Sequence, residues 1–231
     1  MAGGRTELAI DSASGEAGVA LLAGDRVLAC RRWTIATNYS LELLGGLDAA
    51  LRDAAVARDA IGAIAVDIGP GGYSGLRGGV ATAQGLALAL DVPLAGVSRL
   101  EAAAFPHLAR ARPVVAVHDP GGGRVAWAAY AAGTPTPAVL VEPRLGTIEE
   151  CVRDAPPGAL WCGELTAELV AARAAVSGHT ERGDEDVPPD ENVRSPADLG
   201  RLARLHGAYG DPGLVDVVYL RPPSITRPAG R

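Results

Sequence analysis

The stretch from Asp67 to Leu90, DIGPGGYSGLRGGVATAQGLALAL, constrains the fold of this 231-residue chain more than any other segment. It holds seven glycines within 24 residues. Its first residues end a buried strand, AIGAIAVDIGP, and a helix follows from near Ser74. Glycine inside a helix costs about 1 kcal/mol relative to alanine. The stretch therefore predicts either a turn that wraps a phosphate or a helix that another backbone approaches closely.

The turn does not match either common nucleotide-binding motif. A P-loop requires G-x-x-x-x-G-K-[ST], and the chain contains no lysine. A dinucleotide fingerprint requires G-x-G-x-x-G, and Ser74 stands where a third glycine would follow Gly69 and Gly71. The strand end, glycine turn and helix N-terminus still favour an anion, with Arg77 in the first helical turn. A turn that needs positive φ is the favoured interpretation, and a nucleotide loop is the minor one.

The helix after the turn has a side made of small residues. These are Gly75, Gly78, Gly79, Thr82 and Gly85, while Leu76, Val80, Ala83, Ala87 and Leu90 form its apolar stripe. Several glycines in one helix make sense where another backbone comes close to it. That neighbour is either an element of the same chain or a second subunit, and the pattern leaves both alternatives open.

A second turn that could bind a ligand lies within IDSASGEAGVAL, in which Asp11 ends a strand. Ser12, Ser14 and Gly15 then form a small turn. A carboxylate at this place can hold a metal-bound nucleotide, and the turn can wrap a phosphate. Alternatively Asp11 caps its own turn, which is the commoner role of such a residue.

The remaining pattern predicts an α/β protein with a mixed sheet, because three strands come first and helices and strands then alternate. The expected strands are 7–10, 17–22, 26–33, 60–70, 93–97, 112–118, 124–131, 136–145, 158–164 and one within 214–231. The expected helices are 37–56, 74–90, 99–110, 147–153, 166–176 and 196–210, and a polar, acidic loop is expected over 178–194. A boundary between two lobes falls near residues 95–115.

Cap residues support several of these helices. The expected N-caps are Thr37, Asn38 or Ser40 for the first helix, Ser98 for the third, and Ser195 followed by Pro196 for the last. Pro106 predicts a kink or break within helix 99–110.

Charge and cysteine content limit the classes of function. The formal charge is 21 − 27 = −6, so the chain is a poor candidate for binding nucleic acid on its own, which needs Lys or Arg at phosphates. The absence of lysine excludes a lysine nucleophile or Schiff base. Cys30, Cys151 and Cys162 lack C-x-x-C spacing and predict a reducing compartment without a zinc site. No signal peptide and no membrane-spanning run is recognisable, so we expect a cytoplasmic protein that does not contact membranes.

Catalytic arrangements are scarce. The four histidines are scattered, and no H-x-x-x-H or H-E-x-x-H pair suggests a metal site. The sequence around Ser74 does not have the G-x-S-x-G spacing of a nucleophile elbow. His118 and Asp119 form the one suggestive pair, although a histidine at a strand end is more often structural. The acidic run 181–191 is interpreted as a solvated loop, and no catalytic or metal-binding residue is predicted.

Three stretches together resemble the TsaB (YeaZ) family. They are LAIDSASGEAGVALL near the start, DIGPGGYSGLRGGVATAQGLAL in the middle, and VDVVYLR near the end. The resemblance implies an actin-like ATPase (ribonuclease H-like) fold of two lobes, each with a mixed sheet and flanking helices. The lobes would be residues 1–100 and 101–231, with the last helix or strand a candidate to return to the first lobe.

The resemblance also implies a function. Proteins of this family act as non-catalytic partner subunits that work with a TsaD-like catalytic subunit and a TsaE-like ATPase to form threonylcarbamoyladenosine in tRNA. The tRNA would be contacted indirectly through the complex. No intrinsic cofactor is expected, ATP or ADP would sit at the interface of the complex, and the free protein could be a homodimer. The alternatives are an ATPase or kinase of the same fold, or a glycoprotease-like paralogue acting alone.

The family motifs carry two sets of site residues onto this chain. The expected partner interface consists of Tyr39, Leu43, Leu47, Gly75, Leu76, Gly79, Val80, Ala83 and Leu86. A vestigial nucleotide or phosphate loop would consist of Asp11, Ser12, Gly69, Gly71, Ser74 and Arg77. The chain departs from the family pattern at Tyr39, Leu41, Gly45, Gly121 and Ala126, which puts the details of partner contacts in question.

Overall fold

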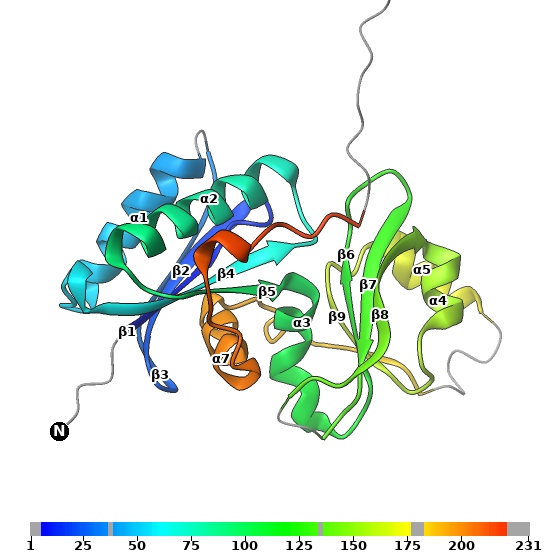
Figure 1. The fold of residues 1–231 in the computed structure, drawn as a ribbon. Coiled ribbons are helices and arrows are strands. Elements are labelled where there is room, and N and C mark those ends of the chain that lie inside the picture. The colour runs from blue at the N-terminus through cyan, green and yellow to red at the C-terminus, as the bar shows by residue number, and fades with distance from the viewer. Residues whose placement is uncertain (1–5, 37–38, 134–135, 177–182, 221–231) are drawn as a thin grey trace, which may run out of the picture.

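The computed structural model describes residues 6–36, 39–133, 136–176 and 183–220. In this part of the chain, two five-stranded mixed sheets lie side by side, each with helices on its faces (Figure 1). The predicted α/β class with mixed sheets is therefore confirmed. Strands of the first sheet lie between residues 6 and 98, and strands of the second lie between residues 114 and 186.

The first sheet has the order β3-β2-β1-β4-β5. Its strands are β1 (Thr6–Asp11), β2 (Glu16–Ala23), β3 (Arg26–Thr34), β4 (Ile61–Gly69) and β5 (Leu94–Ser98). The first three strands are antiparallel neighbours, whereas β4 pairs in parallel with both β1 and β5. A parallel pair needs a crossover, and the helices α1 (Tyr39–Asp53) and α2 (Tyr73–Leu90) supply the two crossovers.

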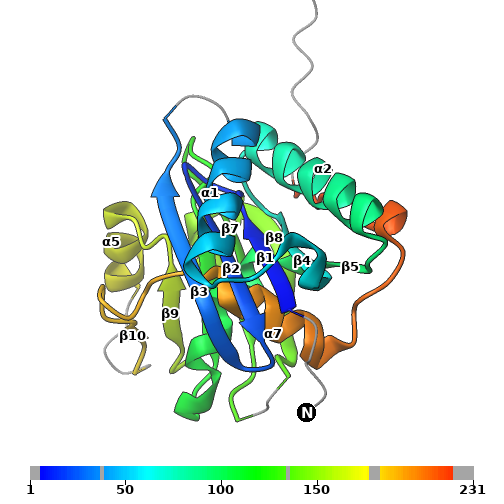
Figure 2. The same cartoon turned by 90° about the vertical axis from the view of Figure 1, so that its left-hand side faces the viewer.

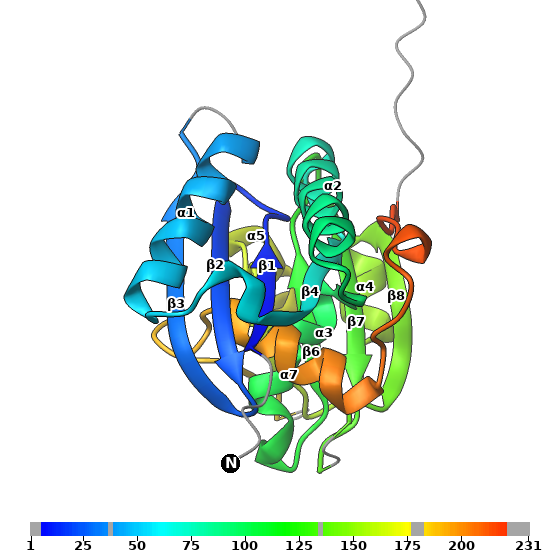
Figure 3. The ribbon, with the colours of Figure 1, turned by 60° about the vertical axis from the view of Figure 1, so that its left-hand side comes forward.

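Both faces of the first sheet are covered. Figure 3 shows α1 and α2 on one face and α7 (Pro196–His206) on the other. Side chains alternate along β1, so Leu8 and Ile10 pack under α1 and α2 while Ala9 packs against α7. The apolar stripe expected on the glycine-rich helix lies in this core. The last helix of the chain thus packs on the first sheet rather than the second.

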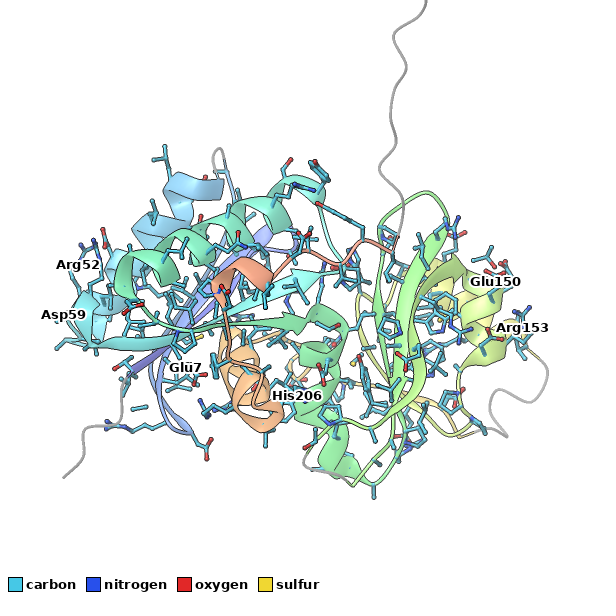
Figure 4. All side chains as sticks on the ribbon, in the orientation of Figure 1. Glu7, Arg52, Asp59, Glu150, Arg153 and His206 are labelled. Atoms are coloured by element: carbon cyan, nitrogen blue, oxygen red, sulfur yellow. The ribbon has the colours of Figure 1, made fainter. Side chains whose placement is uncertain are left out.

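Polar contacts fix α7 in this position. Arg204 on α7 forms an ion pair with Glu7 of β1, and His206 Nε2 lies 2.6 Å from the Glu101 carboxylate of α3 (Arg99–Ala104). Figure 4 labels Glu7 on β1 and His206 at the end of α7. Ser195 accepts a hydrogen bond from the Ala197 amide at 3.3 Å, which confirms the predicted cap of this helix.

The second sheet has the order β10-β9-β6-β7-β8. Its strands are β6 (Val114–His118), β7 (Arg124–Tyr130), β8 (Val139–Thr147), β9 (Leu160–Gly163) and β10 (Glu185–Asp186). The helices α4 (Ile148–Asp154) and α5 (Ala167–Ala175) cover its outer face, and α3 (Arg99–Ala104) lies on the inner face, between the two sheets (Figure 1). As Pro106 predicted, α3 ends early and a 3₁₀ helix, Phe105–Arg110, follows it.

The predicted strand in the tail is wrong within the described residues. Residues 215–219 form no strand, and a 3₁₀ helix, Pro212–Leu214, precedes them. The alternating Val215 and Val217 pack against the first core, while Gln84 of α2 donates to the Pro212 and Val215 carbonyls at 3.1 and 2.9 Å. The apolar alternation therefore reflects packing without strand pairing.

The acidic loop is also more ordered than predicted. Its Glu185 and Asp186 form β10 at the edge of the second sheet, which Figure 2 shows beside β9. Arginines neutralise much of its charge, since Arg110 pairs with Glu191, Arg112 with Glu185, and the buried Arg173 with Asp186. These partners come from other elements, which local composition does not reveal.

Two smaller predictions need comment. Ser98 occupies the N-cap position of α3 but makes no capping bond there, because its hydroxyl bonds Tyr130 instead. Thr37 and Asn38, and the side chain of Ser40, lie outside the described residues.

No helix in the described segments is long and apolar enough to cross a membrane.

Candidate functional site

The β1–β2 turn and the glycine turn pack directly on each other. The Gly72 amide donates to the Ala13 carbonyl at 2.9 Å, and a Cβ at Gly71 would lie 2.2 Å from the same oxygen. A backbone oxygen cannot rotate away, so Gly71 has to lack a side chain here. The glycine turn is therefore occupied by the chain's own backbone.

The close neighbour of the glycine-rich helix is the same turn. Ser12 Oγ donates to the Gly75 carbonyl at 2.9 Å, and a Cβ at Gly79 would lie 1.9 Å from that hydroxyl. At Gly85 no atom lies within 4 Å of such a Cβ. Of the two alternatives left open by the sequence, an intramolecular neighbour thus explains Gly79, while Gly85 faces outward.

The six candidate phosphate-loop residues separate into two places. Asp11, Ser12, Gly69 and Gly71 come together where the two turns meet, and Gly69 alone among them has positive φ, +106°. Ser74 is exposed on α2, and Arg77 Nε donates to the Tyr219 hydroxyl at 2.8 Å, away from the turn. The structure thus brings together four of the six, without Ser74 and Arg77.

Arg194 fills the polar side of the β1–β2 turn. Asp11 is 3% exposed, and Arg194 binds both of its oxygens, with Nη2 3.1 Å from Oδ1. The same Nη2 lies 3.1 Å from Ser14 Oγ. The carboxylate that could hold a metal-bound nucleotide is therefore already neutralised by a bidentate guanidinium.

A second buried arginine links this turn to the second sheet. Arg99 is 3% exposed, donates to the Ala13 carbonyl at 3.3 Å and forms an ion pair with Glu164. Glu164 also accepts hydrogen bonds from His118 Nδ1 at 2.8 Å and from the Asp119 amide at 2.9 Å. Burial raises the pKa of Glu164, but the His118 hydrogen bond and the Arg99 charge outweigh it and lower the pKa to about 2. Glu164 is therefore the anionic centre that joins the two sheets.

Asp67 is the remaining acid of the network. It is fully buried, and its Oδ1 accepts the Gly69 amide at 2.7 Å. Within the described residues no donor reaches Oδ2. Burial, and then the negative charge of Asp11, raise the pKa of Asp67 to about 7. Half of its population thus carries a proton near neutral pH.

The raised pKa of Asp67 predicts a pH dependence of stability. The unfolded chain releases this proton near pH 4 and the folded chain near pH 7, so its contribution is full below pH 4 and falls as the pH rises to 7. We expect Asp67→Asn, which does not titrate, to gain about 3 kcal/mol in unfolding free energy relative to wild type between pH 4 and 7. Urea unfolding of both proteins across this range is the measurement. Parallel pH profiles would contradict the raised pKa.

A cleft of about 590 Å³ opens between the two sheets next to the ion-pair network. Its charged lining residues are Glu16, Arg32, Arg99, Glu164 and Arg194. Buried His107 also lines it, and burial followed by the charge of Arg110 lowers the His107 pKa. Among the described residues, no group of three or more His, Cys, Asp or Glu side chains is arranged to hold a metal ion. His118 is engaged with Glu164 and carries no nucleophile beside it.

The expected partner-interface residues mostly lie in the chain's own core. Those that are buried are Leu43, Leu47, Gly75, Leu76, Gly79, Val80 and Ala83. Leu86 is half-buried, and the side chain of Tyr39 lies outside the described residues. Packing inside the monomer accounts for these buried positions without a partner, and their assignment to an interface stays a prediction.

Other residues of the same helices form the exposed surface. Leu41 and Leu44 on α1 are 71% and 43% exposed, and Leu88 on α2 is 69% exposed. Leu214 of the tail is 83% exposed, and its 3₁₀ helix packs on α2. Hydrophobic periodicity identifies the side of a helix that faces the sheet. Only the tertiary structure shows which apolar side chains lie on the opposite, exposed side. We call Leu41, Leu44, Gly85, Leu88 and Leu214 the outer apolar row.

The departures from the family pattern lie in three environments. Leu41 belongs to the outer apolar row. Gly121 lies in the exposed β6–β7 turn with φ +80°, where its amide bonds the Asp119 carboxylate at 2.7 Å. Ala126 is buried in β7 opposite His118. Of these three, Leu41 alone is an exposed side chain on a helix.

Comparison with known proteins supports the resemblance. Residues 34–175 match the family model described as "TsaD: tRNA N6-adenosine threonylcarbamoyltransferase". The TsaB protein of Bacillus subtilis is 38% identical over 96 residues, which cover 42% of each chain. An uncharacterized Mycobacterium tuberculosis protein is 30% identical over 94% of this chain and 92% of its own. The chain is thus aligned with less than half of the curated B. subtilis protein and with nearly all of the mycobacterial one.

Solved structures agree on the fold. YeaZ from Pseudomonas aeruginosa superposes with a TM-score of 0.72 at 27% identity, over 93% of this chain and 99% of that one. A dehydratase activator from Clostridium difficile, solved with bound ADPNP, gives 0.52 at 12% identity, over 88% of this chain and 95% of that one, which shows the shared actin-like fold alone. The predicted fold and family resemblance are confirmed. The chain belongs to the TsaD family and is a TsaB/YeaZ-type member of it.

Proposed function

We propose that this protein is a non-catalytic partner subunit in the formation of threonylcarbamoyladenosine in tRNA. It would work with a TsaD-like catalytic subunit and a TsaE-like ATPase, and it would reach tRNA chiefly through the complex. The observation that carries the proposal is that the chain itself fills the place where a phosphate would bind. Arg194 neutralises Asp11, and the Ala13 backbone packs into the glycine turn. Relatives named for threonylcarbamoyladenosine biosynthesis or for the threonylcarbamoyl transferase support the pathway.

The same observation argues against an ATPase or kinase that acts alone. A magnesium–nucleotide complex needs a free carboxylate and space for phosphate beside the turn, whereas both are occupied by the chain itself. We therefore place any ATP or ADP at the interface with the catalytic subunit. A glycoprotease-like activity also lacks support, because Ser74 is exposed on α2 and His118 is bound to Glu164.

Calorimetry separates this proposal from the autonomous-ATPase alternative. We expect no heat of binding when magnesium and ATP at about 1 mM are added to the isolated protein, which corresponds to a binding free energy weaker than about −4 kcal/mol. Saturable binding that is lost in Asp11→Asn would favour the ATPase instead.

The outer apolar row is the surface we propose for the catalytic subunit. Large exposed leucines on two neighbouring helices are unusual on an isolated subunit and typical of an interface. Gly85 lies three residues before Leu88 on α2 and leaves the α2 backbone open to close approach. If the free protein forms a homodimer, its second copy would occupy the same row and compete with the catalytic subunit.

A bulky residue at Gly85 tests the surface. We expect Gly85→Leu to abolish co-purification with the TsaD-like subunit, because the new side chain holds the partner backbone away from α2. Its melting temperature should stay within a few degrees of wild type, since nothing lies within 4 Å of the added Cβ. Gly85→Ala is the matched control and should retain association. Intact association of the leucine variant would reject this surface.

A further inference from the structure

The cleft between the two sheets contains polar side chains that the chain itself leaves without partners. Its volume of about 590 Å³ lies in the range of small-molecule binding sites. It is lined by the β1–β2 turn and the end of β3, by α3 and the 3₁₀ helix after it, and by the ends of β6 and β9. Apolar side chains also line it, among them Leu100, Ala103 and Val117. The cleft thus has the size and the mixed lining that a small polar molecule with a carbon frame needs.

His107 is the buried member of the unpartnered group. The residue is 4% exposed, and neither ring nitrogen forms a hydrogen bond within the described residues. The described polar atoms that lack both a partner and access to solvent do not include these nitrogens, so the polar edge of the ring opens into the cleft that it lines. Burial, and then the charge of Arg110, lower the pKa of His107, which keeps the ring neutral with one donor and one acceptor. A buried group of this kind normally has a hydrogen-bond partner.

Three exposed side chains project from one face of the first sheet at the rim of the cleft. Glu16 lies opposite Thr34 where β2 pairs with β3, and Arg32 is two residues from Thr34, on the same face. A Cβ at Gly18 would lie 3.1 Å from Arg32 Cγ and 2.6 Å from Pro196 Cγ. The lack of a side chain at Gly18 therefore lets the stem of Arg32 lie close to the sheet beside the start of α7.

The two charged side chains at the rim are not neutralised. The other two arginines of the cleft form ion pairs with Asp11 and Glu164. Within the described residues, Arg32 and Glu16 form no ion pair, either with each other or with a third group. The one hydrogen bond of the Arg32 guanidinium joins Nη1 to the Arg194 carbonyl at 3.5 Å. One positive and one negative group are thus available in the same cleft as His107.

This set of groups matches the chemistry of an α-amino acid. A guanidinium binds a carboxylate through two parallel hydrogen bonds, and a carboxylate accepts hydrogen bonds from an ammonium group. A plain anion would be attracted by Arg32 and repelled by Glu16, and a plain cation would meet the reverse. A neutral imidazole suits an uncharged amide or hydroxyl, because both can donate and accept.

We propose that the cleft binds a free α-amino acid that has an uncharged polar side chain. Arg32 binds its carboxylate and Glu16 its ammonium group. His107 forms a hydrogen bond with the amide or hydroxyl of its side chain, and Leu100 and Val117 contact its carbon atoms. This site goes beyond the proposed subunit role, because it uses neither the outer apolar row nor the glycine turn.

Titration calorimetry of the full chain, without a partner, tests the site. The probes are L-asparagine, L-glutamine, L-serine and L-threonine, of which at least one should bind with a Kd of about 1 mM or lower. Analogues of the bound probe that lack the ammonium group or the carboxylate should bind about tenfold more weakly or worse. For L-glutamine these analogues are glutaramic acid and 4-aminobutanamide. Absence of binding by all four probes at about 10 mM, or equal binding of the analogue without the ammonium group, would overturn the proposal.

Substitutions at the rim test the two charged contacts. Arg32→Gln and Glu16→Gln should each weaken binding about tenfold or more, since each removes a charged hydrogen-bond partner. Arg31→Gln is the matched control, because Arg31 projects from the opposite face of β3 and pairs with Asp53. Its affinity should equal that of wild type. Unchanged affinity in Arg32→Gln, or an equal loss in Arg31→Gln, would reject the rim contacts.

Substitution of His107 separates a ligand contact from a structural role. His107→Phe should weaken binding about fivefold. The free variant should melt at or above the wild-type temperature, because an apolar ring replaces an unpartnered polar one. His107→Leu makes the same comparison with a smaller side chain. Loss of stability with unchanged affinity in both variants would assign His107 to the fold and reject the contact. These titrations contain no partner subunit, so their outcome is separate from that of the Gly85→Leu experiment.

Discussion

Replacing Arg194 with alanine is expected to destabilise the protein by about 3–5 kcal/mol, as removal of one partner of a buried ion pair does. The variant leaves Asp11 without its bidentate partner, close to the buried Asp67. Two carboxylates then share a site with Arg99 as the nearest compensating charge. Urea unfolding monitored by circular dichroism measures the loss.

Matched variants separate the buried pair from ordinary surface pairs. Arg31 and Asp53 form an ion pair in which both side chains are nearly half exposed, so Arg31→Ala should cost far less stability than Arg194→Ala, because solvent screens an exposed pair. Adding Asp11→Asn to Arg194→Ala should restore part of the stability, because the stranded charge is removed. A cost for Arg194→Ala as small as that of Arg31→Ala would mean that the network does not stabilise the fold.

Replacing Gly79 with leucine is expected to prevent folding or to cost about 3 kcal/mol or more, in contrast to the same change at Gly85. A Cβ at Gly79 would lie 1.9 Å from Ser12 Oγ and 3.2 Å from Ser12 Cβ. The hydroxyl is bonded to the Gly75 carbonyl, so the β1–β2 turn has to move away from α2 to make room. Soluble expression and thermal unfolding of the two leucine variants give the comparison.

A compensating change shows whether the Ser12 side chain causes the effect. Gly79→Ala should be destabilising in the wild-type background and tolerated together with Ser12→Gly, which removes the opposing atoms. If Gly79→Leu folds and melts as wild type does, the close packing of the turn on α2 is wrong.

The secondary structure was largely predictable because it depends on neighbours in the sequence. The continuous apolar run in β1 reports a strand buried on both faces, and the helical stripe of α2 reports one buried face. The same logic failed in the tail, where Val215 and Val217 alternate but pack on the core without strand pairing. It also missed β10, whose acidic residues are held by arginines distant in the sequence.

The candidate site was predictable only in part. Asp11 and Gly71 were recognised as members of a degenerate phosphate turn, and the structure places both where the two turns meet. Periodicity could not distinguish the stripe that packs on the sheet from the stripe available to a partner, because it marks the buried face. Leu43 and Val80 are buried in the monomer, whereas Leu41 and Leu88 are exposed, and the interface itself stays a prediction.

The sequence by itself determined the α/β class, the two glycine-containing turns and the family, since each depends on residues close together in the chain. Only the tertiary structure decided what fills those turns. Arg194 lies 183 residues from Asp11, and Ser12 lies 63 residues from Gly75. No local pattern encodes these pairings. The first arises when the segment before α7 returns to the first sheet, and the second arises when β4 pairs with β1. Gly71 and Gly79 accommodate the chain's own β1–β2 turn, while Gly85 is left open on the outer side of α2.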